Sequence, residues 1–291
     1  MEGPALAVQQ RIEAAGSVDI RAQGARLAGQ LVLPVGLPRA AVVIHPATGA
    51  PAGFYRAFAG WLAAERDCAV LTYDYRDFGG SATGPMRRAR ASMIDWGLRD
   101  QAAALATLGR LVPQVPRWVI GHSMGGVWMG FHPAMAGVER AITVGSGLTH
   151  VSDHPFGYRM KARAFWHGPV PWLAGALGYL PGSRLGLGAD LPLEVYRDWR
   201  RWCLTKGFNL SDVGRILPLP DPALVTAKMR LIAIADDVMV PPPAVWRLMG
   251  VYPQAEKRQL VLRPAEFGLD RIGHLGPFHK RNAVVWPALV D

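Results

Sequence analysis

Seven short runs of β-branched and aliphatic residues alternate with longer segments of helical character along most of the chain. Most of these runs are continuously apolar, which is typical of strands whose two faces are both covered. This alternation predicts an α/β fold, a mostly parallel sheet with helices on both sides. The expected strands are RLAGQLVL (26–33), AAVVIH (40–45), AVLTYDY (69–75), RWVIG (117–121), AITVGS (141–146), RLIAIA (230–235) and RQLVLR (258–263).

Five segments between and after these strands are expected to be helical. Asp95 is expected to cap the second of them, which PQVP at 113–116 ends, because the residue before a proline disfavours helical geometry. The segments are 55–66, 94–111, one opening at Met124, 243–249 and about 278–289.

One interval interrupts the alternation of strands and helices. From about residue 150 to residue 228 the sequence is rich in Trp, Pro and Gly and contains helical pieces such as LEVYRDWRRWCL, but no clear strand. Because it lies between two sheet strands, we interpret it as an inserted helical cap. The predicted organisation is a core of residues 1–149 and 229–291 and a cap of residues 150–228.

Composition limits the compartment in which the protein is expected. Half of the 291 residues are apolar, enough to bury a substantial core. The first residues lack the pattern of a secretion signal, and no apolar run reaches the roughly 18 residues of a membrane span. Segment 168–182 comes nearest, but it is short and contains three prolines, so it is expected to lie against lipid or to cover a pocket. Two cysteines cannot form a disulfide framework, and a cytoplasmic protein is expected.

The net charge of +10 limits the class of partner. A basic surface attracts phosphates, but the arginines are scattered and no nucleic-acid-binding signature accompanies them. We therefore expect no nucleic-acid partner. Peripheral contact with an anionic lipid surface stays open, and the oligomeric state is not predicted.

The stretch VIGHSMGGVWMG, at 119–130, places a serine between glycines at an abrupt change of pattern. An apolar strand leads into Gly121-His122-Ser123-Met124-Gly125, and a helix is expected to follow. This context predicts a nucleophile elbow, in which a strained turn exposes the Ser123 hydroxyl at the sheet edge. The expected helix N-terminus would favour an oxyanion there.

A serine hydroxyl needs a neighbouring base, and the base needs a carboxylate that orients it. The strand at 230–235 is followed directly by Asp236 and Asp237, and the strand at 258–263 leads to His274 and His279. His274 is favoured because it lies in a loop between glycines, whereas His279 begins the last helical segment.

Together, GHSMGG, ADDVMVP and GHLG resemble the α/β-hydrolase superfamily over nearly the whole chain. More narrowly, YLPGSRLGLGADLP, DWRRWC and RIGHLGPF are similar to bacterial α/β-hydrolases related to serine aminopeptidases and lysophospholipases. The resemblance implies that Ser123 is the nucleophile, His274 the base and Asp237 the orienting acid, since Asp237-Val238-Met239-Val240-Pro241 matches the D-x-x-V-P loop. Asp236 would then brace the turn, with Asp153 a weaker alternative acid.

The resemblance also implies an oxyanion hole made of two backbone N–H groups. The first would come from Met124, the residue after the nucleophile. The second would come from HPATGAP, where Pro46 has no N–H to donate, so Ala47 is expected and Thr48 is the alternative.

Three further groups of residues stand out in the sequence. His150 and His154, which flank Asp153, have a spacing that could hold a metal if helical, but without a convincing third ligand no metal site and no cofactor are expected. Residues 73–81 are expected to form a loop near the active site, in which Asp74 or Asp77 braces the backbone and Arg76 forms an ion pair. The cap aromatics could equally line an acyl pocket or dock the cap: Trp166, Trp172, Tyr179, Trp199 and Trp202.

The leading prediction is a serine hydrolase that cleaves a carboxylic ester of an apolar small-molecule acyl substrate through an acyl-enzyme. A thioesterase or lysophospholipase with the same triad is the alternative, motivated by the basic surface and the apolar cap. A third interpretation is a binding or scaffold protein with an idle triad.

Overall fold

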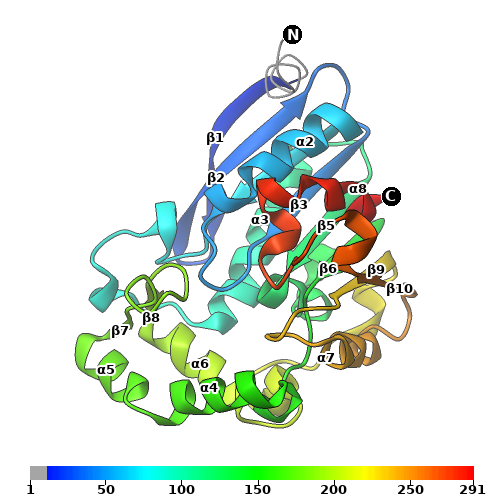
Figure 1. Ribbon diagram of the computed structural model, residues 1–291. Helices are drawn as coiled ribbons and strands as arrows, with labels where there is room; N and C mark the ends of the chain where they lie inside the picture. The colour runs from blue at the N-terminus through cyan, green and yellow to red at the C-terminus, as the bar shows by residue number, and fades with distance from the viewer. Residues whose placement is uncertain (1–11) are drawn as a thin grey trace.

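The computed structural model describes residues 12–291 and contains a central eight-stranded sheet (Figure 1). Its strand order is β1-β2-β4-β3-β5-β6-β9-β10. β2 pairs antiparallel with both β1 and β4, and the strands from β4 to β10 are parallel. The strands are β1 (Ile12–Ala22), β2 (Ala25–Pro34), β3 (Ala40–His45), β4 (Cys68–Tyr73), β5 (Arg117–His122), β6 (Arg140–Val144), β9 (Lys228–Ile234) and β10 (Glu256–Leu262).

Helices cover both faces of this sheet, which confirms the predicted fold class and explains why the strand sequences are continuously apolar. Val42 and Ile44 of β3 pack in one core with α2 (Arg56–Arg66) and α8 (Trp286–Val290). Ala41 and Val43 of the same strand pack in the other core with α3 (Gln101–Leu111) and α7 (Pro242–Arg247). Successive residues of a strand point to opposite faces, so both sets must be apolar.

All seven expected strands are present, with ends shifted by up to two residues. One strand of the central sheet was missed, as were two strands of two residues each within residues 150–228. β1 forms a hairpin with β2 at the sheet edge. Its sequence GSVDIRA alternates apolar and charged residues. An edge strand of this kind exposes one face to solvent and lacks the apolar run that marked the other strands.

The expectation that a helix begins at Met124 is wrong. Ser123–Gly126, Met129–Phe131 and Pro133–Met135 form three separate 3-10 turns. Gly125, Gly126 and Gly130 weaken helical propensity, and Pro133 cannot donate a backbone hydrogen bond. The last expected helix is also divided, since Gly276–Phe278 and Lys280–Val285 are 3-10 turns and α8 alone is α-helical.

The helix at 94–111 begins differently from the expectation. Asp95 does not cap it alone, because Ser92 lies at the start and the two residues bond reciprocally. The Ser92 hydroxyl accepts from the Asp95 N–H at 3.1 Å, and the Asp95 carboxylate accepts from the Ser92 N–H at 3.0 Å. This is a capping box. Asp95–Asp100 then forms a π-helical turn before α3.

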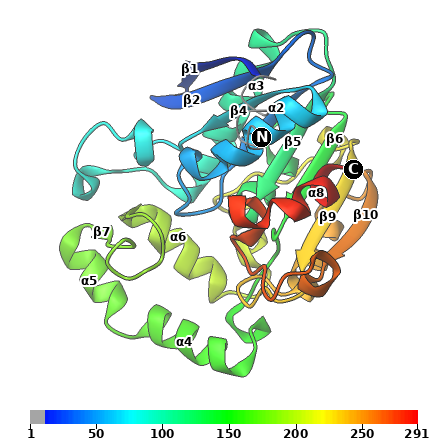
Figure 2. The same cartoon turned by 45° about the horizontal axis from the view of Figure 1, so that its top comes forward.

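The region predicted as a cap, residues 150–228, lies between β6 and β9 over the carboxyl edge of the parallel strands (Figures 1 and 2). It carries α4 (Phe156–His167), α5 (Val170–Leu177) and α6 (Leu193–Cys203), with the two-residue strands β7 (Tyr179–Leu180) and β8 (Leu191–Pro192). Both views place α6 nearer the sheet, with α4 and α5 on the outer side. The division into core and cap remains our proposal.

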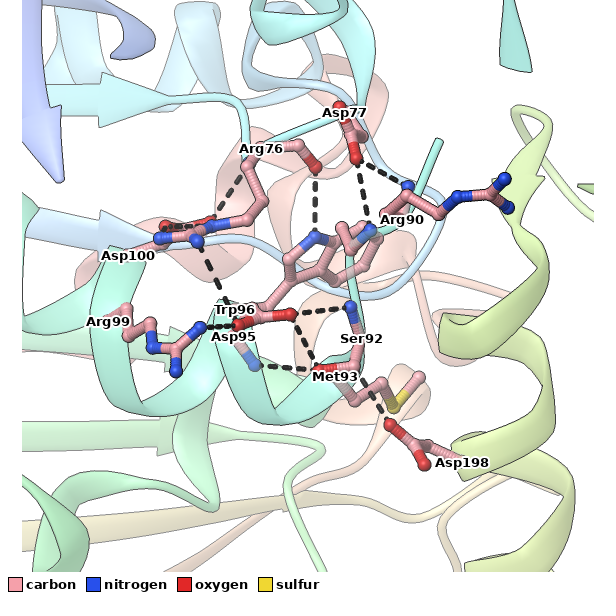
Figure 3. Close-up of polar contacts among 11 residues, drawn as sticks. Arg76, Asp77, Arg90, Ser92, Met93, Asp95, Trp96, Arg99, Asp100 and Asp198 are labelled. Atoms are coloured by element: carbon pink, nitrogen blue, oxygen red, sulfur yellow. Dashed lines mark hydrogen bonds and ion pairs between the residues drawn. The ribbon is translucent and has the colours of Figure 1, made fainter. Parts of the chain in front are cut away.

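Two of the contacts of α6 reach segments outside residues 150–228. The Asp198 carboxylate accepts from the Met93 N–H at 3.1 Å, beside the capping box of Ser92 and Asp95 (Figure 3). The Trp202 ring packs edge-on against Trp128, with centroids 5.6 Å apart. The cap therefore rests on the segments that follow β4 and β5, next to the predicted nucleophile.

Candidate functional site

Ser123 occupies the turn between β5 and the first 3-10 turn in a strained conformation. Its φ is +53°, in the left-handed region that residues with a side chain rarely adopt. A Cβ at Gly121 would lie 2.4 Å from Gly126 Cα, and one at Gly125 would lie 2.1 Å from the His45 carbonyl oxygen. Both glycines are thus required for the backbone to turn here, as the nucleophile elbow predicts.

Three segments that are distant in sequence meet at Ser123. His274 Nε2 lies 2.8 Å from the Ser123 hydroxyl oxygen, and His274 Nδ1 lies 2.6 Å from an Asp237 carboxylate oxygen. The Asp237 side chain is fully buried and that of His274 is 7% exposed. The arrangement allows His274 to take a proton from Ser123 while Asp237 fixes the orientation of the ring.

Asp236 and Asp237 hold different parts of this site. The second Asp237 oxygen accepts from the N–H groups of Met239 and Val240, at 2.8 and 3.0 Å. Asp236 instead accepts from the N–H groups of Ile272 and Gly273, each at 3.0 Å, and so braces the loop that carries His274.

The remaining alternatives lie in other contacts. His279 is exposed and caps a 3-10 turn by accepting from the Arg281 N–H. Asp153 accepts from the His150 N–H at 2.7 Å and pairs with Arg247. Neither of these residues bonds to Ser123 or His274, so the structure brings together the residues that the resemblance selected.

The predicted oxyanion donor Ala47 is already engaged. Its N–H donates to the Tyr55 hydroxyl at 2.8 Å, and Tyr55 is also 2.8 Å from His122 Nδ1. The Ala47 N–H is therefore occupied in this conformation, which favours the alternative donor, Thr48. Sequence reasoning missed Tyr55, because nothing in the sequence indicated that its ring would turn back under the HPATGAP loop.

Thr48 and Met124 retain suitable N–H groups. Among residues 12–291, the Thr48 N–H has no hydrogen-bond partner, and Thr48 is half-buried. Met124 lies in the first turn of its 3-10 helix, where backbone N–H groups lack intrahelical partners. Since a 3-10 turn and no α-helix follows Ser123, the expected helix N-terminus is absent.

His122 joins the elbow to the loop of His274. Its Nε2 lies 3.0 Å from the His274 carbonyl oxygen. Burial, followed by the nearby His274, lowers the pKa of His122 to about 3. The ring is therefore neutral, and the partners assign its proton to Nε2: Tyr55 donates to Nδ1, and Nε2 donates to the carbonyl.

The loop that follows β4 is braced as the sequence predicted. The Asp74 carboxylate accepts from the Ala52 N–H at 2.7 Å and from the Gly80 N–H at 2.8 Å. Asp77 accepts from the N–H groups of Arg90 and Ala91, and Arg76 pairs with Asp100 at 2.6 Å (Figure 3). Asp74 thus holds the loop that carries Thr48 close to the elbow.

The cap aromatics divide between docking and exposure. Trp202 docks on Trp128, and Trp166 is buried and stacks on Tyr196 of α6. Trp172 is 84% exposed, so it lines no acyl pocket in this conformation.

The predicted histidine pair of the cap makes local hydrogen bonds. His150 Nδ1 accepts from the Ser152 N–H, and His154 Nδ1 lies 3.0 Å from the Val238 carbonyl oxygen. Within residues 12–291, no group of three or more His, Cys, Asp or Glu side chains is arranged to hold a metal ion.

The strand order, the nucleophile elbow after β5 and the loops after β9 and β10 together define an α/β-hydrolase fold. The structure thus has the fold of the α/β-hydrolases. Residues 36–145 match the family described as serine aminopeptidase, S33. That match includes Ser123 but ends before Asp237 and His274.

Solved structures support the same fold at low sequence identity. An esterase from Thermogutta terrifontis is 17% identical, with 94% of this chain and 96% of that chain covered and a TM-score of 0.53. A hypothetical protein from Pseudomonas aeruginosa is 17% identical, with coverages of 96% and 94% and a TM-score of 0.58. An esterase from Pyrococcus furiosus is also 17% identical, with coverages of 94% and 88% and a TM-score of 0.58. No curated protein matches this chain.

In the described part of the chain, no helix has both the length and the apolar character needed to cross a membrane.

Proposed function

We propose that this protein is a serine hydrolase that cleaves a carboxylic ester through an acyl-enzyme. The observation that carries the proposal is the chain of contacts from Asp237 to His274 to Ser123, at 2.6 and 2.8 Å. A scaffold protein has no need for a buried acid, an imidazole and a strained serine in this order. The proposal is also supported by the similarity to serine aminopeptidases and by the fold shared with two esterases.

In the proposed reaction, His274 Nε2 takes the proton of Ser123 as the serine oxygen attacks the substrate carbonyl carbon. Asp237 stabilises the imidazolium that forms. The N–H groups of Met124 and Thr48 bind the oxyanion, since the Ala47 N–H is held by Tyr55. His274 then protonates the leaving alcohol. Water attacks the acyl-enzyme by the same route and regenerates Ser123.

A fluorophosphonate probe tests the proposal directly, because it reacts with activated serines. We expect stoichiometric labelling of the wild type, none of Ser123→Ala, and unchanged labelling of Ser152→Ala, which removes an exposed serine outside the site. Turnover of short p-nitrophenyl esters should follow the same pattern. Folded wild-type protein that is neither labelled nor active on any ester of the panel would refute the proposal.

A second candidate function, hydrolysis of a thioester or lysophospholipid, is favoured by a hollow of about 350 Å³ beside the HPATGAP loop. Arg56, His279 and Lys280 in its lining are basic, and no lining residue is acidic. The full lining consists of Gly53, Phe54, Arg56, Ala57, His279 and Lys280. Such a lining suits a phosphate-bearing substrate. Arg56→Gln/Lys280→Gln should then raise KM for acyl-CoA or lysophosphatidylglycerol and leave KM for neutral esters unchanged.

A further inference from the structure

The outer side of the cap exposes large apolar side chains from α4 and α5. Trp172 is 84% exposed and Phe156 is 71% exposed. Phe156 and Met160 are four residues apart on α4 and therefore lie on one helix face. We call the following four residues the outer cap surface: Phe156, Met160, Trp172 and Leu173. Exposed large side chains gathered on neighbouring elements mark an interaction surface.

The helices α4 and α5, which carry this surface, have charged side chains of a single sign. Residues 154–189 contain no Asp or Glu, although the whole chain has 22. Four cations lie in the same stretch, and none forms an ion pair with a carboxylate of residues 12–291: Arg159, Lys161, Arg163 and Arg184. The Arg159 guanidinium lies 5.7 Å from the centre of the Phe156 ring.

We propose that the outer cap surface docks the protein on an anionic lipid bilayer. An exposed tryptophan suits the level of the lipid headgroups, where the polar N–H and the apolar ring are both accommodated. Neighbouring lysines and arginines are attracted to anionic headgroups. Together, apolar side chains and a cationic fringe are the combination by which proteins lie on a membrane without spanning it.

A second copy of this chain is the competing occupant, and charge argues against it. In a two-fold dimer the same patch lies on both subunits, so the cations of one outer cap surface would face those of the other. Like charges brought together in this way disfavour association. An anionic bilayer instead complements every one of these cations.

The proposed membrane binding does not depend on whether Ser123 is catalytic.

Vesicle co-sedimentation of the full chain tests the proposal. We expect binding to vesicles of phosphatidylcholine with about 30% phosphatidylglycerol, which is roughly the anionic share at which surface charge dominates. Binding to pure phosphatidylcholine should be weak, and about 0.5 M salt should release the protein from the anionic vesicles. Trp172→Ala/Phe156→Ala should weaken binding by about 10-fold or more. Lys161→Gln/Arg163→Gln should weaken it by about 25-fold, at about fivefold for each charge removed.

Matched controls come from the opposite edge of the sheet. Leu37→Ala removes a side chain that is 95% exposed between β2 and β3, and Arg110→Gln/Arg258→Gln removes two exposed cations far from the cap. Both should bind vesicles as the wild type does. Turnover of a soluble ester by every variant reports that the fold is intact.

Three results would overturn the proposal: no binding of the folded wild type to anionic vesicles, equal losses in the cap variants and the controls, or a dimer that Trp172→Ala converts to a monomer. Loss of esterase activity without loss of vesicle binding would instead count against the proposed function alone.

Discussion

His122 Nε2 donates a hydrogen bond to the carbonyl oxygen of His274 at 3.0 Å, across 152 positions of the sequence. The contact fixes the loop of the proposed base relative to the elbow of the proposed nucleophile. Through Tyr55, the same imidazole is also linked to the backbone of Ala47. One buried, neutral ring thus joins the three segments on which the proposed chemistry depends.

Replacing His122 should therefore impair turnover more than substrate binding. We expect His122→Phe to lower kcat by about 10- to 100-fold with little change in KM, because a small displacement of a catalytic group has a large effect on rate. Steady-state kinetics on a soluble ester measures the split. His167→Phe, at an exposed histidine that ends α4, should leave both constants unchanged. An unaltered kcat in folded His122→Phe would contradict the positioning role.

The two adjacent aspartates should be separable by kinetics. Asp237→Asn removes the carboxylate that contacts His274 and should lower kcat by about 10⁴-fold. Asp236→Asn keeps an acceptor for the Ile272 and Gly273 N–H groups and should lower kcat by less than about 10-fold. Similar losses in both variants would show that Asp237 has no special role.

The ion pair between Arg76 and Asp100 should behave as a coupled unit. The Arg76 Nε and Nη2 atoms donate to one Asp100 oxygen at 2.8 and 2.6 Å, and Asp100 is fully buried (Figure 3). Either Arg76→Met or Asp100→Asn leaves a buried group without its partner and should lower the free energy of unfolding by about 3–5 kcal/mol. Urea unfolding of Arg76→Met/Asp100→Asn should show a loss well below the sum of the single losses. Additive losses would mean that the pair is not coupled.

Three buried histidines should make folding stability fall in mild acid. Burial lowers the pKa of His45 well below its ordinary value, that of His122 to about 3 and that of His132 to about 4. Each ring is neutral in the folded chain but is protonated in the unfolded chain below a pH of about 6.5. The free energy of unfolding therefore has its full value above that pH. As the pH falls below it, the free energy of unfolding decreases by about 1.4 kcal/mol per pH unit for each ring.

Buried Asp100 opposes part of this effect, because burial raises its pKa to about 6. Between about pH 4 and 6 the folded chain holds a proton on Asp100 that the unfolded chain releases, so this group alone makes the folded chain more stable as the pH falls. A difference between variants isolates one histidine. His132→Leu should reduce the slope of unfolding free energy against pH by about 1.4 kcal/mol per unit between pH 4.5 and 6. At pH 7.5 it should not destabilise, since neither His132 nitrogen has a hydrogen-bond partner among residues 12–291. An unchanged slope in urea unfolding would contradict this prediction.

Patterns that depend on local sequence were read correctly. The strands β3, β5 and β9 are apolar on both faces because helices cover both sides of the sheet, and that requirement is visible residue by residue. The elbow at Ser123 could be located because glycines are needed wherever the backbone passes within van der Waals distance of another segment. Failures occurred where one face is solvated, as in β1, or where glycine and proline outweigh the apolar pattern, as after Met124.

The sequence by itself determined the alternating order of elements, the sharp turn at Ser123 and the short set of acids and histidines from which a triad could be drawn. The tertiary structure decided which members of that set meet: Asp237 reaches His274 whereas Asp236 binds the loop backbone, and Tyr55 occupies the Ala47 N–H. The physical reason is that a hydrogen bond forms or fails within a few tenths of an ångström, and the tertiary fold, not a local pattern, sets such distances between separate loops.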